Sequence, residues 1–326
     1  MHPAFSVIFL TTLIGVGQGL FLALYTGQVY SLIHVLPTQA EGGFYAGGSA
    51  LALLFLIAGL AASFFHLGHP ERAWRSAAKW RTSWLSREVI VLPSFMGTVF
   101  LYAAVHYTGW NPQIAILGES LPLDLSLVLG AVGTVLCLAL FVCTAMIYAC
   151  LKFLQEWHSP LTVVNYLLLG SASGFTLAAA FSVYSAPDMV RFYGTWAMII
   201  TFAGLLTRAA SLVRNARLKP KSTLQTAIGV RHVQVAQKAQ GFMGGSFNTR
   251  EFFHGKPVRL LRSVKWLFLL GAFVMPLLLL GGALSSLAGA FFSAAFLTQY
   301  AGLLAERWFF FAQANHPQNL YYQAIS

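Results

Sequence analysis

Between Phe64 and Ile90 the sequence reads FFHLGHPERAWRSAAKWRTSWLSREVI, a run that closes one long apolar segment and opens the next. Three side chains in this run suit proton transfer or anion binding. The imidazole of His66 titrates near neutral pH, the carboxyl group of Glu88 can relay a proton, and Arg72 carries a fixed positive charge. The spacing predicts that these three residues lie together at one face of a membrane.

Further ionisable residues interrupt apolar segments near the same predicted face. His158 precedes one segment, whereas Arg208 and Glu306 lie near the ends of two others. Such residues are costly to bury in a membrane and mark functional sites by default. His34 and His106 fall near the opposite face, and the central thickness is almost free of ionisable groups. This one-sided distribution argues against a proton pump or an ion channel. The sequence also shows no matching broken helices at the midplane and no internal repeat, which argues against a secondary transporter.

The composition determines the class of protein that must position these residues. Hydrophobic residues make up 57% of the chain and charged residues only 9%. A membrane core of about 30 Å is crossed by about 20 apolar residues in a helix. The sequence therefore predicts an all-α fold, a polytopic bundle of eight transmembrane helices in one integral membrane domain, residues 1–326. The predicted spans are 5–35, 44–68, 88–108, 124–152, 161–184, 189–213, 264–282 and 286–312.

The connection 214–263 is the longest polar segment between these spans. It mixes basic and apolar residues at near-helical spacing, which predicts one or two short helices at the membrane surface. Such a segment can lie on lipid or serve as a docking platform for a soluble partner. A tight turn at Gly281–Gly282 and Ser285–Ser286 is expected between the last two spans. The first span lacks the basic start of a signal peptide, so we expect it to be retained.

The charges predict the orientation of the bundle. Of 20 Lys and Arg residues, five lie between residues 72 and 87 and eleven between 214 and 265. Because short basic loops stay in the cytoplasm, both termini and these two connections are expected there, in a bacterial inner membrane. The net charge of +11 then fits anionic lipid. No nucleic-acid-binding module accompanies the basic residues, which argues against a nucleic-acid partner.

A polar pocket at one face of an apolar bundle is typical of a site for a lipid-soluble substrate with a polar head, such as ubiquinone or menaquinone. We expect His66 to donate a proton to a quinone oxygen, and Glu88 or Glu306 to relay protons from water. The alternatives are a helix cap for His66 and a helix-dipole interaction for Glu88. A haem b subunit is a further alternative, for which His34 and His106 are the one suitable pair.

The three cysteines predict no metal site. Cys137, Cys143 and Cys150 all fall in the fourth predicted span, with spacings that match neither a zinc site nor an iron–sulfur ligand run. Buried, reduced thiols that pack as small apolar side chains are expected.

The motifs HLGHPERAW and SWLSREV resemble those of the membrane-anchor subunit of dimethyl sulfoxide reductase and its relatives, and EWHSPLT, NYLLLG and LLAERWFF look like segments of proteobacterial members. The resemblance implies a complex of a molybdopterin catalytic subunit, a four-cluster iron–sulfur subunit and this anchor, which has no metal centre of its own. It links the histidine of HLG and the glutamate of the second motif, here His66 and Glu88, to quinol binding.

The same resemblance suggests roles for other basic residues. Arg72 and Arg75 are expected to contact the iron–sulfur subunit or lipid phosphate, and His158 and Arg208 the quinone pocket or a partner. Exported reductases of this family carry their soluble subunits outside, whereas the charge bias here predicts cytoplasmic partners. That favours an anchor of a cytoplasm-facing sulfite dehydrogenase, which passes electrons to quinone. An anchor that oxidises quinol for a dimethyl sulfoxide reductase stays open, since the substrate chemistry lies on another polypeptide.

Overall fold

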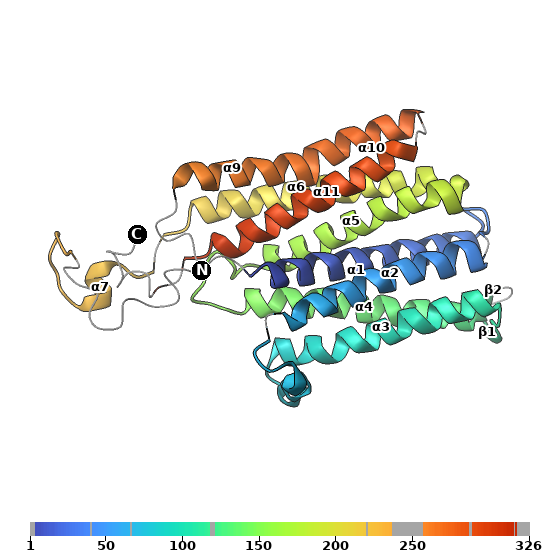
Figure 1. Cartoon of the computed structure of the whole chain (residues 1–326), viewed down its shortest axis with the longest axis horizontal. Coiled ribbons are helices and arrows are strands. Elements are labelled where there is room, and N and C mark those ends of the chain that lie inside the picture. The colour runs from blue at the N-terminus through green and yellow to red at the C-terminus, as the bar shows by residue number, and fades with distance from the viewer. Residues whose placement is uncertain are drawn as a thin grey trace.

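The computed structural model describes residues 4–39, 41–65, 67–117, 121–219, 221–236, 257–286, 289–315 and 317, and nearly all of its regular structure is helical (Figure 1). The elements are α1 (Phe5–Leu32), the π-helix η1 (Glu41–Ala46), α2 (Gly47–Phe64), the 3₁₀-helix η2 (Pro70–Lys79), α3 (Trp84–Thr108), the strands β1 (Gln113–Leu117) and β2 (Leu121–Asp124), α4 (Leu125–Ala149), α5 (Pro160–Ser185), the 3₁₀-turn η3 (Pro187–Met189), α6 (Val190–Ala216), α7 (Leu224–Ile228), α9 (Val258–Leu269), the π-helix η4 (Leu270–Val274), α10 (Met275–Ser286) and α11 (Gly289–Ala312).

Seven helices in the described part of the chain are long and apolar enough to cross a membrane. They are α1, η1 with α2, α3, α4, α5, η3 with α6, and the continuous helix formed by α9, η4 and α10. The eighth predicted span corresponds to α11, which has 24 residues but carries Gln299, Glu306 and Arg307 within its length. These polar residues lower its hydropathy, so an eighth span stays a prediction.

The helices run along the long axis of the molecule (Figure 1). The start of α1, the end of α11 and α7 lie at one end, here called the basic end. The antiparallel hairpin of β1 and β2 lies at the other, here called the hairpin end. Among the described connections, the basic end holds the basic residues of η2 and of the segment after α6, whereas the hairpin end holds Asp124 and Asp188. Arg191, at the start of α6, is the exception.

The third helix begins before its predicted start at 88. Ser83 caps it, because its hydroxyl accepts a hydrogen bond from the amide of Ser86 at 3.3 Å. The guanidinium of Arg87 stacks on the Trp84 ring at 4.2 Å and donates to the carbonyl of Trp80 at 2.9 Å. Glu88 therefore lies one turn inside the helix rather than at its first residue.

The helix formed by α9, η4 and α10 also differs from its predicted bounds. It runs without a break from Val258 to Ser286 and passes through Gly281 and Gly282, where a turn was expected. A helix keeps its backbone hydrogen bonds satisfied in lipid even at glycine, whereas an open turn does not. The last part of the predicted surface segment 214–263 thus forms the first turns of this helix, and residues 237–256 lie outside the described residues.

The core of the bundle is centred on α1 and α5. In their most apolar windows these helices bury 72% and 78% of their residues, against 28–39% for the other five spans. Their backbones touch, because a Cβ atom on Gly174 would overlap the backbone of Gly19 and Leu20. Gly15 and Gly170 face each other in the same seam. Small residues permit this close approach between membrane helices, and the other spans pack around the resulting pair.

Candidate functional site

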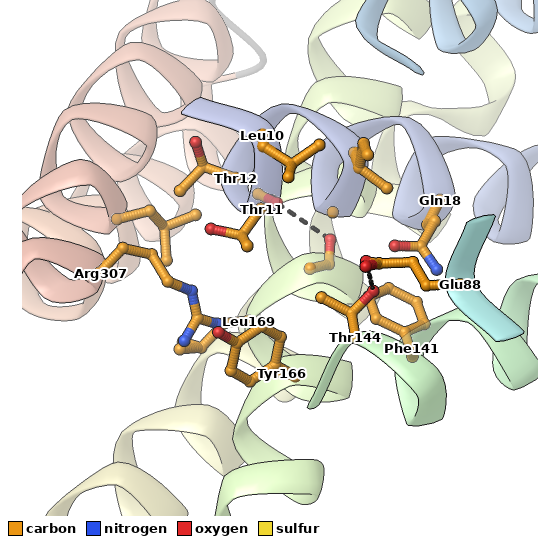
Figure 2. Close-up of a pocket in the computed structure, with 15 residues that line it drawn as sticks. Leu10, Thr11, Thr12, Gln18, Glu88, Phe141, Thr144, Tyr166, Leu169 and Arg307 are labelled. Atoms are coloured by element: carbon orange, nitrogen blue, oxygen red, sulfur yellow. Dashed lines mark hydrogen bonds between the residues drawn. The ribbon is translucent and has the colours of Figure 1, made fainter. Parts of the chain in front are cut away.

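A buried cavity, here called the inner cavity, lies between five helices toward the basic end (Figure 2). About 20 Å³ of it is open to the centre of a water molecule, which is room for one water. It is lined by Leu10, Thr11, Thr12, Ile14, Gly15 and Gln18 of α1, Glu88 of α3, Phe141 and Thr144 of α4, Tyr166, Leu169, Gly170 and Ser173 of α5, and Leu303 and Arg307 of α11. Of the sequence-predicted site residues, Glu88 lines this cavity.

Glu88 reaches the inner cavity from α3 and is 8% exposed. Its carboxyl group accepts a hydrogen bond from the hydroxyl of Thr144 on α4, with 2.5 Å between the oxygens. This bond fixes one carboxyl oxygen against α4. A buried carboxyl group held in this way can bind, store or release a proton at the edge of the cavity.

Arg307 faces Glu88 from the opposite side of the inner cavity, and Tyr166 lies between them (Figure 2). The guanidinium carbon of Arg307 is 3.7 Å from the centre of the Tyr166 ring, a close cation–π contact. The Tyr166 hydroxyl has no hydrogen-bond partner within the described part of the chain. The inner cavity therefore brings a carboxyl group, a phenol and a guanidinium group to one small space, where they can stabilise a developing negative charge and transfer protons.

A second, smaller cavity, here called the outer cavity, lies closer to the basic end and also contacts Tyr166 and Arg307. About 10 Å³ of it is open to the centre of a water molecule. It is lined by Glu156, Thr162, Asn165, Tyr166, Arg208, Ser211, Asn215, Glu306, Arg307 and Phe310.

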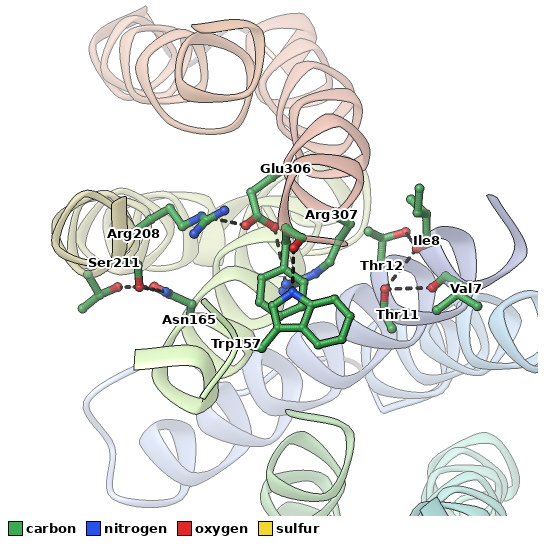
Figure 3. A network of polar contacts seen from close by, with 12 residues as sticks. Val7, Ile8, Thr11, Thr12, Trp157, Asn165, Arg208, Ser211, Glu306 and Arg307 are labelled. Carbon is green, nitrogen blue, oxygen red and sulfur yellow. Dashed lines mark hydrogen bonds and ion pairs between the residues drawn. The ribbon is translucent and has the colours of Figure 1, made fainter. Parts of the chain in front are cut away.

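A buried ion pair joins α6 to α11 beside this outer cavity (Figure 3). Nε of Arg208 and Oε1 of Glu306 are 2.7 Å apart, although the N–H does not point along this line, and both side chains are at most 2% exposed. Nη1 of Arg307 lies 3.4 Å from the other Glu306 oxygen. One carboxylate thus faces two guanidinium groups, and the cluster keeps a net positive charge that Glu88 can offset across the inner cavity.

Neutral hydrogen bonds hold the surrounding helices in register. The amide of Asn165 on α5 donates to the Ser211 hydroxyl of α6 at 2.9 Å and accepts from Thr207 at 2.8 Å. On the far side of the inner cavity, Gln18 donates to the carbonyl of Cys137 at 3.0 Å. Both amides are buried, so these contacts satisfy groups that would be costly to leave unpaired.

Arg72, Arg75 and His158, three further predicted site residues, lie away from the two cavities. Arg72 and Arg75 are exposed in or beside η2, where Arg72 is 3.5 Å from Glu71 and Arg75 stacks on Trp74. His158 is exposed, and its Nδ1 is 2.6 Å from the carbonyl of Ala149 at the end of α4, which makes it a brace for the loop 150–159. His66 lies outside the described residues. The structure thus brings together Glu88, Glu306 and Arg208 around the two cavities and places Arg72, Arg75 and His158 away from them.

Arg307, Tyr166 and Thr144 were not among the predicted site residues. Arg307 follows Glu306 in an apolar run, a signal that could have marked both. A tyrosine and a threonine in apolar helices carry no such signal, since both are common in cores. The described residues that line the inner cavity come from α1, α3, α4, α5 and α11, and none of them belongs to the second predicted span, to which His66 was assigned.

A separate polar cluster, here called the hairpin-end cluster, consists of Gln28, Tyr102, Asn111, Ser126 and His106. Tyr102 donates to Gln28 at 2.8 Å, Gln28 donates to Ser126 at 2.8 Å, and Asn111 bonds Ser126 through both its amide atoms. The imidazole of His106 is 2% exposed, and neither of its nitrogens has a hydrogen-bond partner among the described residues.

His106 stacks on Tyr45 and meets Tyr102 edge-on, with ring centres 4.9 and 4.5 Å apart. His34, its suggested haem partner, is exposed after the end of α1 and has a positive φ of 59°. Within the described ranges, no three His, Cys, Asp or Glu side chains converge as metal ligands do.

Comparison with known proteins identifies the family. The family model described as DMSO reductase anchor subunit (DmsC) matches residues 1–236, which include Glu88, Thr144 and Tyr166. A protein of Allochromatium vinosum, named as the C subunit of sulfite dehydrogenase, is 62% identical over 328 residues, and the alignment covers 100% of both chains. Together with the apolar helices, these matches show that the chain is a multi-pass membrane protein that belongs to the DMSO reductase anchor subunit family.

Proposed function

We propose that this chain is the quinone-reactive anchor subunit of a molybdenum and iron–sulfur oxidoreductase, and that the inner cavity is where the quinone head group exchanges protons. The observation that carries the proposal is the buried Glu88 carboxyl group, held by Thr144 and opposed by Tyr166 and Arg307. The rest of the lining is mostly apolar, which suits the isoprenoid tail of a quinone. The cavity has room for a water rather than for a ring, so binding of the head group includes an opening of the bundle.

The name of the Allochromatium relative supports sulfite oxidation as the reaction of the complex. Sulfite and water would give sulfate, two protons and two electrons on the catalytic subunit, and the electrons would pass through the iron–sulfur subunit to the quinone. Quinone takes up two electrons and two protons to become quinol. In this chain, Glu88 would transfer a proton at a carboxyl oxygen, and Arg307 would stabilise negative charge that develops on the quinone oxygen.

The charge bias supports a cytoplasmic orientation for the basic end, and with it cytoplasmic catalytic and iron–sulfur subunits. The family match supports a second candidate, an anchor that oxidises quinol for a dimethyl sulfoxide reductase. The same residues would then act in reverse, with Glu88 accepting the proton. Quinone reduction by sulfite in the purified complex separates the two candidates, because only the first predicts it.

Glu88→Gln tests the site. The amide keeps the shape of the side chain and its bond to Thr144 but cannot carry the proton. In the intact complex, we expect quinone reduction to fall about 100-fold, while reduction of a soluble dye by the catalytic subunit is unchanged. Asp188→Asn, an exposed residue at the hairpin end, is the matched control. Unchanged quinone turnover in Glu88→Gln would reject this cavity as the site. His66→Ala tests in the same way whether His66, which stays a prediction, is the immediate donor.

A further inference from the structure

A wide, open cavity at the basic end, here called the vestibule, leads from the protein surface toward the buried cluster. About 520 Å³ of it is open to the centre of a water molecule, so it admits bulk water. Its lining includes Glu156, Asn215, Lys219 and Lys221. It lies beside two segments: the loop 150–159, which connects α4 to α5, and the segment that follows α6.

The vestibule, the outer cavity and the inner cavity are connected by shared residues. Glu156 and Asn215 line both the vestibule and the outer cavity. Tyr166 and Arg307 line both the outer and the inner cavity. The three spaces therefore follow one another from surface water to Glu88, and each shares two lining residues with the next.

The residues that line these spaces carry buried polar atoms, which indicate that water occupies the spaces. The Tyr166 hydroxyl, Nη2 of Arg208 and Oε2 of Glu306 are buried and have no hydrogen-bond partner in the described part of the chain, although Oε2 lies 3.4 Å from Nη1 of Arg307. A buried polar group without a partner is costly unless water satisfies it. Both inner spaces have room for about one water molecule and offer it several polar partners, which is what a buried water needs.

The loop that carries Glu156 is fixed in place by α6. The guanidinium of Arg214 donates to the carbonyls of Gln155 and His158 at 2.9 to 3.1 Å, and Asn215 donates to the carbonyl of Glu156 at 3.3 Å. These bonds hold the Glu156 side chain at the junction of the vestibule and the outer cavity. Glu71, another glutamate at the basic end, is instead exposed and lies 3.1 Å from His69.

We infer that these three cavities form the proton route of the site, with Glu156 as the acid that collects protons from water and Tyr166 as the relay into the inner cavity. The inference rests on the proposed function. For each proton that Glu88 gives to a quinone oxygen, Tyr166 gives one proton to Glu88 through water and takes one from the outer cavity. Glu156 supplies that proton and is reprotonated from the vestibule. Two passes balance the two electrons that arrive from the partner subunit.

The environment of Glu156 suits this role. Burial raises the pKa of its carboxyl group above the ordinary value, whereas its backbone hydrogen bonds and the nearby Arg214 lower it. A carboxyl group with a raised pKa holds a proton closer to neutral pH and is a better acid there. The charged groups that face it are Arg214, Lys219 and Lys221 on the vestibule side, and Arg208, Glu306 and Arg307 across the outer cavity.

The test uses the intact complex with sulfite as electron donor and a short-chain ubiquinone analogue as acceptor, at a series of pH values. Glu156→Gln removes the acid but keeps its size, and Tyr166→Phe removes the relay hydroxyl but keeps the ring over Arg307. Glu156→Asp keeps an acid at the junction. Glu71→Gln is the matched control, because it removes an exposed carboxyl group at the same end of the bundle.

We expect Glu156→Gln and Tyr166→Phe to lower quinone turnover about 10-fold at pH values where the wild-type Glu156 carboxyl group is protonated, with unchanged dye reduction. Glu156→Gln should also leave the KM for the quinone unchanged. In the wild type, turnover should fall as the pH rises through the pKa of Glu156, and this inflection should be lost in Glu156→Gln. Azide, whose protonated form is a small diffusible acid, should restore part of the rate of that variant. Glu156→Asp should restore most of the rate that Glu156→Gln loses, and Glu71→Gln should turn over like the wild type.

The inference is overturned if Glu156→Gln keeps the wild-type rate and pH profile while Glu88→Gln is impaired, because protons then reach Glu88 by another route. An equal loss of dye reduction and quinone turnover in Glu156→Gln also overturns it, since the change would then act through folding or assembly. If the wild-type complex reduces no quinone, or if Glu88→Gln is as active as the wild type, the proposed function itself fails.

Discussion

The buried polar groups at the two ends of the bundle differ in how their hydrogen-bonding atoms are satisfied. At the hairpin end, Gln28, Tyr102, Asn111 and Ser126 use their donors and acceptors on one another, and all are neutral. Toward the basic end, charged and phenolic groups line two cavities and leave several polar atoms without hydrogen-bond partners within the described chain.

This difference separates two reasons for a polar residue in a membrane helix. Polar groups that satisfy one another lock the register of neighbouring helices and contribute to stability. Polar groups that face a cavity are costly to bury, so their presence there indicates a function such as binding water, transferring protons or binding a substrate. Removal of one member of a satisfied pair should therefore lower stability at either end, whereas removal of a group without a partner should not, and three measurements test this contrast.

The largest effect on stability should come from the buried ion pair near the basic end. Arg208→Met leaves the Glu306 carboxylate without its closest partner and should lower the free energy of unfolding by about 3–5 kcal/mol. The double variant Arg208→Met/Glu306→Gln removes both charges and should recover much of this loss. Chemical unfolding of the purified chain in detergent measures both. A loss below about 1 kcal/mol in the single variant is what a water-screened pair would give.

A matched pair of tyrosines should give a smaller but more diagnostic difference. Tyr102→Phe removes the hydroxyl that donates to Gln28, and should lower stability by about 1 kcal/mol without changing quinone turnover. Tyr166→Phe removes a hydroxyl that has no partner in the described chain, so stability should stay the same or rise slightly. Thermal unfolding of the two variants beside the wild type measures the difference. Equal losses would contradict the distinction between the two ends.

The smallest effect is expected at His106. Unlike the other members of the hairpin-end cluster, its side chain has no hydrogen-bond partner among the described residues. Its unpartnered imidazole costs stability, so His106→Leu should raise the free energy of unfolding by up to about 1 kcal/mol and leave quinone turnover unchanged. The absorption spectrum of the same samples tests the haem alternative. A b-type Soret band in the wild type that disappears in this variant would make His106 a haem ligand instead.

The positions of most helices could be predicted from the sequence, because in a membrane protein each long apolar run forms one membrane-spanning helix of about the same length. Their ends were harder to predict. The start of α3 depends on the Ser83 cap and on the stacking of Arg87 on Trp84, and both contacts are local details outside the apolar pattern. Gly281 and Gly282 suggested a turn, yet the helix continues through them, because lipid leaves the backbone no other way to satisfy its hydrogen bonds.

The site was harder to predict than the fold. Glu88, Arg208 and Glu306 stand out in the sequence as ionisable residues in apolar runs, but the contacts that they make do not. Thr144 is 56 residues from Glu88 along the chain. The pairing of Arg208 with Glu306 likewise requires that α6 and α11 be neighbours, which hydropathy does not reveal. Periodicity and charge bias describe each helix and its orientation, whereas the site depends on which helices meet.

The glycine seam between α1 and α5 has a mechanical consequence for any molecule that enters the inner cavity. Gly15 and Gly170 form part of the cavity wall, and the two helices already touch through their backbones. Because backbone atoms form the contact between α1 and α5, small side-chain movements cannot enlarge the cavity on this side. Admission of a ring-sized guest must therefore be accommodated by outward displacement of α3, α4 or α11, the helices that carry Glu88, Thr144 and Arg307.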